Sequence, residues 1–321
     1  MLRCDSIPKH RSCRLAENMS IEISPCSQSI IDIGPENIEA IALIVIDEHH
    51  RQIQGGSENV RKNAPETSVS IVSIENYPVL CVKHFKYRGA GHAAKCLFRS
   101  THGLRAFRSG TYLFNHGFTA AASLALIRNS RFMITIEEWL VMVAVPDSKE
   151  LDRYMVNRIR KGWPKEEKWK FLDNLARFMA DLHEYGVFHT DLKTCNILVS
   201  DQCSAGLDMK AADGREMPSI CFSLLDYDDV RVQSGAVDVR MRAKNFAQLY
   251  LSTPSDICMD DRGRFIEQYL KFCGNINIDK NRLIRLLLAR IKGKSLLYVG
   301  PEGDISEEWP SAKEFENCCG R

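Results

Sequence analysis

The chain has 321 residues, 45% of them hydrophobic and 26% charged, and a formal net charge of +2. A chain of this length buries a large core, as one bilobal unit or as two domains, and so small a charge gives no reason to predict a nucleic-acid partner. The twelve cysteines are scattered from Cys4 to Cys319 without a C-x-x-C pair, which argues against a disulfide scaffold or a zinc site. No apolar run approaches the roughly 20 residues that a membrane-spanning helix needs.

The first 28 residues mix Ser, Pro, Cys and Arg without periodicity. We therefore predict a poorly ordered extension over 1–28, a β-rich unit over 29–138, a mainly helical unit over 139–295 and a tail over 296–321. Met19 is an alternative start of the chain, because strand-like alternation begins there.

Strands are predicted early in the β-rich unit. Residues 67–72 alternate between polar and apolar side chains, and residues 79–85 form an apolar run that carries one inward-placed lysine, Lys83. The tip of the predicted hairpin, residues 62–66, contains Asn63 and Pro65, which favour a turn, but no glycine pattern. Read alone, Lys83 is more typical of a strand-end surface lysine.

A basic segment follows. Residues 83–110 contain seven Lys or Arg residues and no Asp or Glu. Two interpretations remain open: a solvated face with a few phosphate contacts, or a surface attracted to anionic lipid or a phosphorylated glycan. Within this region, residues 98–114 are expected to form a helix.

Residues 132–139 predict a strand that enters a linker at Glu138. Residues 167–185 predict a helix, because apolar side chains recur there at helical spacing, and Gly186 is its expected stop. Three further helices are predicted over 245–251, 264–272 and 282–291. The last is basic, and it is either a solvated helix or one that lies on a membrane surface.

The polar stretch after Gly186 carries His189, Asp191, Lys193 and Asn196 at the spacing H-x-D-x-K-x-x-N. This is the pattern of the catalytic loop of the protein-kinase fold. There, the aspartate accepts the proton of the attacking hydroxyl, the lysine neutralises the transferred phosphoryl group, and the asparagine holds a metal ion. An apolar strand, 222–225, then runs into Asp226-Tyr227-Asp228, which makes Asp226 a candidate Mg²⁺ ligand. The polar residues 201–218 between them are expected to be an inserted loop.

With these motifs, the sequence resembles the bacterial lipopolysaccharide inner-core kinases, the Kdo/heptose kinase family of the protein-kinase-like superfamily. The resemblance covers roughly residues 58–275. Besides the loop and the Asp226 segment, it includes Val82 to Gly89, Leu104 to Arg108 with His116 to Thr119, Lys244 to Leu249, and Asp261 to Leu270.

The resemblance implies an α+β, bilobal, protein-kinase-like fold that uses ATP and Mg²⁺ to phosphorylate a sugar hydroxyl of inner-core lipopolysaccharide. It implies a cytoplasmic protein, peripheral at the inner membrane. The implied catalytic residues are Asp191 and Lys193, and the implied metal ligands are Asn196 and Asp226. Nucleotide contacts are expected from Lys83, from Lys62 on the glycine-free hairpin, and from the linker at Glu138.

The sequence departs from the usual kinase pattern in three places. No acid lies between Lys83 and Glu137, so the helix carboxylate that normally pairs with the ATP lysine is absent. Asp228 replaces the glycine of Asp-Phe-Gly, and Ala120 replaces a family proline. We expect Asp226 to hold Lys83, with Glu66 as the alternative partner. A Ser/Thr protein kinase and a catalytically inactive binding module remain alternatives to the sugar kinase.

Overall fold

The structure, a computed structural model, describes residues 11–16, 18–25, 27, 35–88, 100–118, 121–132, 134–145, 147–201, 220–274, 278–295, 298–299 and 305–306. The chain divides into two compact units. Unit 1 contains residues 1–146, 204–215 and 226–228, and unit 2 contains residues 147–203, 216–225 and 229–321. The boundary therefore follows Pro146, later than the expected division after Glu138.

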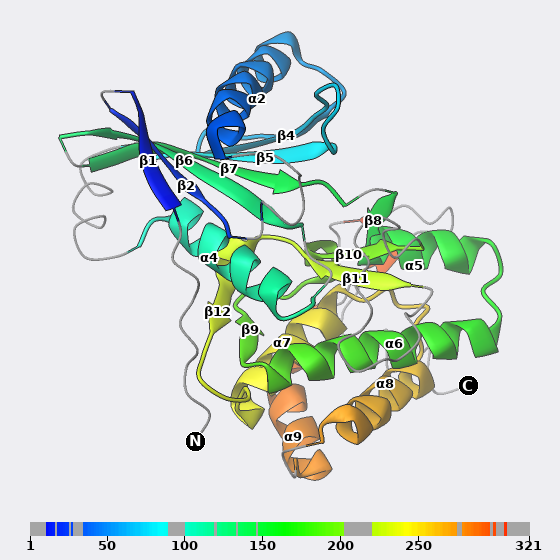
Figure 1. The fold of residues 1–321 in the computed structure, drawn as a ribbon. Helices are drawn as coiled ribbons and strands as arrows, with labels where there is room; N and C mark the ends of the chain where they lie inside the picture. The colour runs from blue at the N-terminus through cyan, green and yellow to red at the C-terminus, as the bar shows by residue number, and fades with distance from the viewer. Residues whose placement is uncertain are drawn as a thin grey trace. The chain divides into compact units, whose positions relative to one another are not determined.

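Unit 1 is built on a seven-stranded antiparallel sheet in the order β1-β2-β6-β7-β5-β4-β3. Two helices, α2 and α4, pack on this sheet (Figure 1). The strands are β1 (Arg11–Ala16), β2 (Met19–Ile23), β3 (Val60–Asn63), β4 (Thr67–Val72), β5 (Leu80–Lys86), β6 (Ser123–Arg131) and β7 (Ile134–Val143), and the helices are α2 (Pro35–Gly55) and α4 (His102–Asn115).

The helices α2 and α4 cover opposite faces of this sheet, as the alternation of side chains along β7 shows. Trp139 packs in the cluster that contains Val45 and Ile46 of α2. Its neighbour Glu138 points the other way and accepts a hydrogen bond from the backbone of Gly103 in α4. By the same alternation on β5, Val82 belongs to the α2 face, so Lys83 points to the α4 face.

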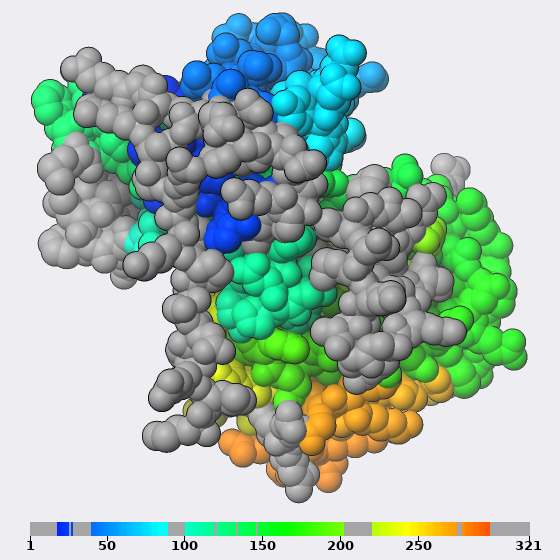
Figure 2. Space-filling model, in the orientation of Figure 1, coloured from blue at the N-terminus to red at the C-terminus, as the bar shows by residue number. Residues whose placement is uncertain are grey.

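Residues 11–23 correct the expected disordered extension over 1–28. They form β1 and β2, which pair with each other and attach to β6. The physical reason is the alternation in β2, where Ile21 and Ile23 are buried in the unit 1 core. The long helix α2 was not predicted either, and its outer side forms part of the exposed surface in Figure 2.

Unit 2 is mainly helical, as predicted, and its small sheets frame the polar loop after Gly186. Its helices are α5 (Leu151–Arg160), α6 (Lys165–Glu184), α7 (Val239–Ser252), α8 (Met259–Phe272) and α9 (Lys280–Ile291), with short 3-10 turns η1 (Thr194–Asn196) and η2 (Tyr227–Asp229), the latter beginning in unit 1. Its strands are β8 (Ser148–Glu150), β9 (Val187–His189), β10 (Ile197–Ser200), β11 (Cys221–Leu224), β12 (Val230–Val232), β13 (Tyr298–Val299) and β14 (Ile305–Ser306).

Gly186 ends α6, as predicted. Its φ is +73°, a conformation that favours glycine. A Cβ atom at this position would lie 2.3 Å from the carbonyl oxygen of Gln233 and 2.5 Å from that of Gly235. Only glycine therefore allows the chain to turn directly from α6 into β9 and the polar loop.

Several predictions lie outside the described residues. These are most of the inserted loop over 201–218, most of the tail over 296–321, and part of the basic segment, including Lys95 and Arg99. Within the described part of the chain, no helix is long and apolar enough to cross a membrane.

Candidate active site

In unit 1, Lys83 is held by two carboxylates. Its Nζ donates hydrogen bonds to Oδ1 of Asp226 and to Oδ1 of Asp228, each at 2.8 Å. Burial alone would lower the pKa of Lys83, but the charges of Asp228 and Asp226 outweigh it and raise the pKa. Lys83 therefore stays protonated. The expected partner Asp226 is present rather than Glu66, and Asp228 is a second partner that the sequence did not suggest.

Asp226 and Asp228 differ in exposure. The side chain of Asp226 is 46% exposed, whereas that of Asp228 is 14% exposed. Asp226 also has a φ of +50°, an uncommon conformation that Asp adopts more readily than most residues. Just after β11, the chain thus presents one accessible carboxylate at Asp226, which stays the candidate metal ligand, followed by a sheltered carboxylate at Asp228.

Glu138 has a different role from the one expected. The strand β7 continues to Val143, so Glu138 lies inside the strand and not at its end. Its carboxylate is fully buried and accepts hydrogen bonds from four groups, namely Arg128 Nε at 3.0 Å, Tyr87 Oη at 2.6 Å, Thr101 Oγ1 at 2.7 Å and the Gly103 amide at 3.0 Å. Glu138 anchors the start of α4 to the sheet, and any adenine-binding linker must begin after Val143.

The hairpin of β3 and β4 forms where predicted, with its turn over residues 64–66. Lys62 lies on β3 opposite Val69, and its side chain is exposed. The structure records no hydrogen bond between Lys62 and the Lys83 cluster among the described residues, so its proposed phosphate contact stays a prediction.

In unit 2, the polar loop runs from β9 through η1 into β10. Lys193 Nζ lies 3.0 Å from Oδ2 of Asp191, and both side chains are about half exposed. The hydrogen bond and charge of Asp191 raise the pKa of Lys193, which stays protonated. Asn196 donates from Nδ2 to the backbone oxygen of Asp191 at 2.8 Å. The three predicted residues Asp191, Lys193 and Asn196 are therefore brought together.

Backbone and side-chain hydrogen bonds connect the loop to the neighbouring strand ends. The Leu225 amide donates to the carbonyl of Asn196 at 2.8 Å, and Thr190 Oγ1 donates to Asp229 Oδ1 at 2.7 Å. His189 Nε2 lies 3.0 Å from the carbonyl oxygen of Leu225. Asp229 is thus engaged in holding the loop.

Helix α7 supplies the loop's supports, which the sequence analysis missed. Asn245 donates to the carbonyl of His189 at 2.5 Å. Gln248 donates to the carbonyl of Thr190 at 2.7 Å and accepts from the Leu192 amide at 3.2 Å. Ser252 accepts from the Thr194 amide at 2.9 Å. The signal was present: three polar residues at spacings of three and four mark one face of a helix.

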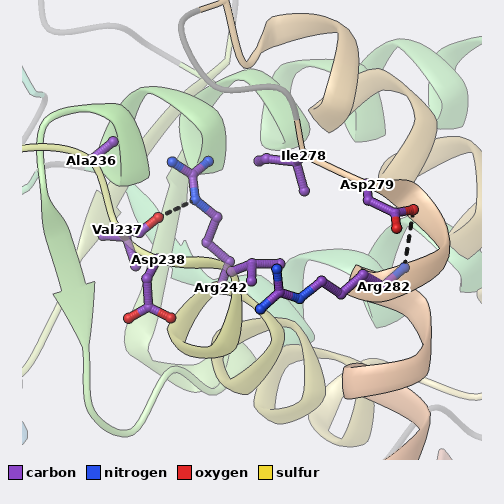
Figure 3. A pocket seen from close by; sticks show the side chains of 8 residues that line it. Ala236, Val237, Asp238, Arg242, Ile278, Asp279 and Arg282 are labelled. Atoms are coloured by element: carbon purple, nitrogen blue, oxygen red, sulfur yellow. Dashed lines mark hydrogen bonds between the residues drawn. The ribbon is translucent and has the colours of Figure 1, made fainter.

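A separate pocket of about 250 Å³ lies in unit 2 beside the first turns of α7 and α9 (Figure 3). The guanidinium of Arg242, one of its lining residues, is fully buried and bonded to the carbonyl of Val237, to Tyr269 and to Glu184. None of the predicted site residues lines this pocket, and its buried cation is already paired.

No group of three or more His, Cys, Asp or Glu side chains could hold a metal ion within the described ranges. The donor chemistry predicted for Mg²⁺ is different, since Mg²⁺ is commonly held by one or two protein carboxylates together with phosphates and water. Asp226 offers a half-exposed carboxylate, and Asn196 offers an amide oxygen whose neighbour is the Cys195 thiol, a weak donor at 3.9 Å. Both are oxygen ligands of the kind that Mg²⁺ takes, so their chemistry fits the ion.

Comparison with known proteins agrees with the resemblance read from the motifs. Residues 122–269 match the sequence model of the lipopolysaccharide kinase (Kdo/WaaP) family. No curated protein matches the chain. Among solved structures, the chain is similar to "WaaP in complex with acyl carrier protein", at 15% identity and a TM-score of 0.52, over 87% of this chain and 96% of that one. At this identity, the likeness supports the fold alone.

The matched residues 122–269 contain Asp191, Lys193, Asn196 and Asp226 together with the supporting helix α7. A kinase of this kind uses ATP and acts on a sugar hydroxyl. The predicted α+β, protein-kinase-like fold is therefore confirmed, and residues 122–269 are similar to the lipopolysaccharide kinase (Kdo/WaaP) family, whose members are phosphotransferases.

Proposed function

We propose that this protein transfers the γ-phosphoryl group of ATP to a hydroxyl of Kdo or heptose in inner-core lipopolysaccharide. The observation that carries the proposal is the loop of unit 2, where Asp191, Lys193 and Asn196 lie within one hydrogen-bonded turn. The family match supports lipopolysaccharide as the acceptor, and the choice between Kdo and heptose is left to experiment.

In the proposed reaction, Asp191 accepts the proton of the sugar hydroxyl as that oxygen becomes the nucleophile. Its half-exposed carboxylate is accessible to a bulky acceptor. Lys193, which stays protonated, stabilises negative charge on the group being transferred.

ATP would supply the phosphoryl group, and a bound Mg²⁺ would neutralise part of its charge. We propose that Asn196 and Asp226 hold the ion and that Lys83 contacts the phosphates. Lys62 on the exposed hairpin strand is a second candidate phosphate contact. Glu138 is not proposed as a nucleotide contact, because its carboxylate is buried and bonded to four donors.

The deciding experiment measures ATP consumption by the purified protein with three acceptors: a glycolipid carrying Kdo alone, one carrying Kdo and heptose, and a general protein substrate. Mass spectrometry of the product then locates the phosphate. Phosphorylation of either sugar supports the proposal and identifies it. Phosphate on protein with none on glycolipid would establish the Ser/Thr kinase alternative, and nucleotide binding without turnover would establish the inactive binding module.

We also propose that the protein works at the cytoplasmic face of the inner membrane, where such an acceptor is made. The exposed cation Arg88 and the partly buried Lys86 belong to the basic segment. Replacing Lys86, Arg88, Lys95 and Arg99 with Gln should release the protein from anionic vesicles at low salt, at about 1 kcal/mol per charge. Co-sedimentation equal to that of the parent would show that these residues are only a solvated face.

A further inference from the structure

The ATP lysine of a kinase is normally aligned by a carboxylate on a nearby helix, and here that helix has none. Helix α4 contains no Asp or Glu in any of its fourteen residues. Lys83 is nevertheless only 12% exposed and bonded to two acids. One of these, Asp226, is the proposed metal ligand. Some other group must hold Lys83 when a metal ion occupies Asp226.

Asp228 has the contacts for this task. Its Oδ1 accepts from Lys83 at 2.8 Å, and its Oδ2 lies 2.9 Å from Nδ1 of His102, the first residue of α4. The same Nδ1 also lies 3.1 Å from Nη2 of Arg105, a group that can only donate, whereas a carboxylate oxygen can only accept. Nδ1 cannot serve both groups, and the shorter contact assigns its proton to the hydrogen bond with Asp228. Arg105, one turn further along α4, donates from Nε to the backbone oxygen of Asp228 at 3.3 Å. Both oxygens of one carboxylate thus connect the lysine to the helix.

His102 is itself fixed by the fold. The start of α4 is bonded to the buried carboxylate of Glu138 through Thr101 Oγ1 and the Gly103 amide. The ring of His102 stacks near that of Phe85 on β5, with centroids 6.3 Å apart. A Cβ atom on Gly103 would lie 2.4 Å from Glu138 Oε2, so this close approach of helix and strand needs the glycine. The sheet therefore determines where the donor lies.

We propose that Asp228 and His102 are positioning residues that together replace the missing helix carboxylate. The usual arrangement is reversed: the acid follows strand β11, and the helix contributes the hydrogen-bond donor. Two departures from the usual kinase pattern then belong together. Asp228 stands where the glycine of Asp-Phe-Gly is usual, and α4 carries no acid. The consequence for catalysis rests on the proposed function, whereas the contact itself does not.

The test measures how readily the Lys83 amine becomes accessible when its bond to Asp228 is lost, in the absence of nucleotide and metal. The rate at which an amine-reactive reagent labels Lys83 is measured by peptide mass spectrometry, with exposed Lys149 as the internal reference. Asp228→Asn should raise the rate about tenfold, the size expected for loss of a charge-assisted hydrogen bond. His102→Phe, which keeps the stacked ring, should raise it about threefold. His102→Asn, whose amide can still donate, should stay within about twofold of the parent.

The double variant decides whether the two residues act together. If His102 acts through Asp228, combining His102→Phe with Asp228→Asn should label no faster than Asp228→Asn alone. Effects that multiply in the double variant would overturn the proposal, as would parent-like labelling of Asp228→Asn. Glu66→Gln is the control for loss of a nearby acid, and Asp228→Glu, which keeps the charge, guards against a folding defect.

The same variants separate this inference from the proposed function. Asp228→Asn should raise KM for ATP more than it lowers kcat, because it disturbs the nucleotide lysine and leaves Asp191 intact. If the parent shows no phosphoryl transfer at all, the proposed function fails, and the labelling rates still decide whether Asp228 and His102 hold Lys83.

Discussion

Lys83 in unit 1 and the loop around Asp191 in unit 2 are held in place by different interactions. Lys83 is bonded to two carboxylates, one of which contacts a histidine. The loop is bonded through its backbone to the uncharged side chains of Asn245, Gln248 and Ser252 on α7. A charged cluster can exchange partners when a phosphate or a cation arrives, whereas neutral backbone bonds fix a geometry. The contacts of Lys83 are thus of a kind that an arriving ligand can replace, whereas those of the loop around Asp191 are not.

The strongest test of this comparison is Asp191→Ala. It removes the proposed general base and leaves the α7 bonds in place, so the rate of phosphoryl transfer should fall by roughly 10²–10⁴-fold. Nucleotide affinity, measured by titration calorimetry, should stay near that of the parent. The exposed Asp256→Ala is the matched control. A variant that keeps more than about a tenth of the activity would exclude Asp191 as the base.

Lys83→Met should have the next largest effect. The charge that is proposed to contact the phosphates is lost, so kcat/KM should fall by at least about 10²-fold, or roughly 2.7 kcal/mol. Glu66→Gln should lower it less than about threefold, because Lys83 is bonded to Asp226 and Asp228 instead. Steady-state kinetics on both variants measures this, and an active Lys83→Met enzyme would remove the lysine from the nucleotide site.

Gln248→Leu tests the hydrogen bonds that hold the loop around Asp191. It leaves the carbonyl of Thr190 and the amide of Leu192 without their partner, at a cost of about 1–3 kcal/mol for each group that stays buried. We expect kcat to fall about tenfold with the affinity for ATP unchanged, since the defect is confined to the loop that carries Asp191. Gln268→Leu on α8 is the control. A selective loss of ATP affinity instead would contradict the assignment of α7 to the loop.

The smallest expected effect is a pH dependence of stability shared by both units. In unit 1, burial and the nearby His84 lower the pKa of His49 to about 3. In unit 2, burial and the charge of Arg242 lower the pKa of His183 to about 3. Both are neutral when folded, whereas the unfolded chain takes up protons below about pH 6.5. Stability should therefore fall as the pH drops from about 6.5 toward 3, by at most about 1.4 kcal/mol per pH unit for each histidine.

Urea unfolding of the parent and of His49→Gln and His183→Gln at pH 7.5 and pH 5.5 measures this dependence. Each variant should lose less stability than the parent between the two pH values, because one proton-binding group of the unfolded state is gone. Equal losses in parent and variants would show that the two histidines do not contribute.

The residues around Asp191 could be predicted because their chemistry is local. Asp191, Lys193 and Asn196 lie within one turn of chain, so their spacing alone indicates a loop that brings them together. The position of Asp226 just after β11 was predictable for the same reason, since an apolar strand leads into the acid. Helix periodicity placed α6, α7, α8 and α9 correctly, although each begins earlier than expected.

The residues that the sequence could not place depend on distant contacts. Asp228 is 145 positions from Lys83, and no local pattern joins them. Glu138 was misplaced because Trp139 and the apolar residues after it continue β7 to Val143. The strand β1 shows no alternation and pairs with β2, which in turn pairs with β6, more than a hundred residues away along the chain.

Strand β3 has a consequence for the solution behaviour of the protein. It is the last strand of the unit 1 sheet, so one side of its backbone has no neighbouring strand among the described residues. An open sheet edge is a template on which another molecule can add a strand, and charged residues there hinder such self-association. Arg61 and Lys62 are exposed on β3. By this principle, these two cations would hinder a second molecule from adding a strand at the open edge.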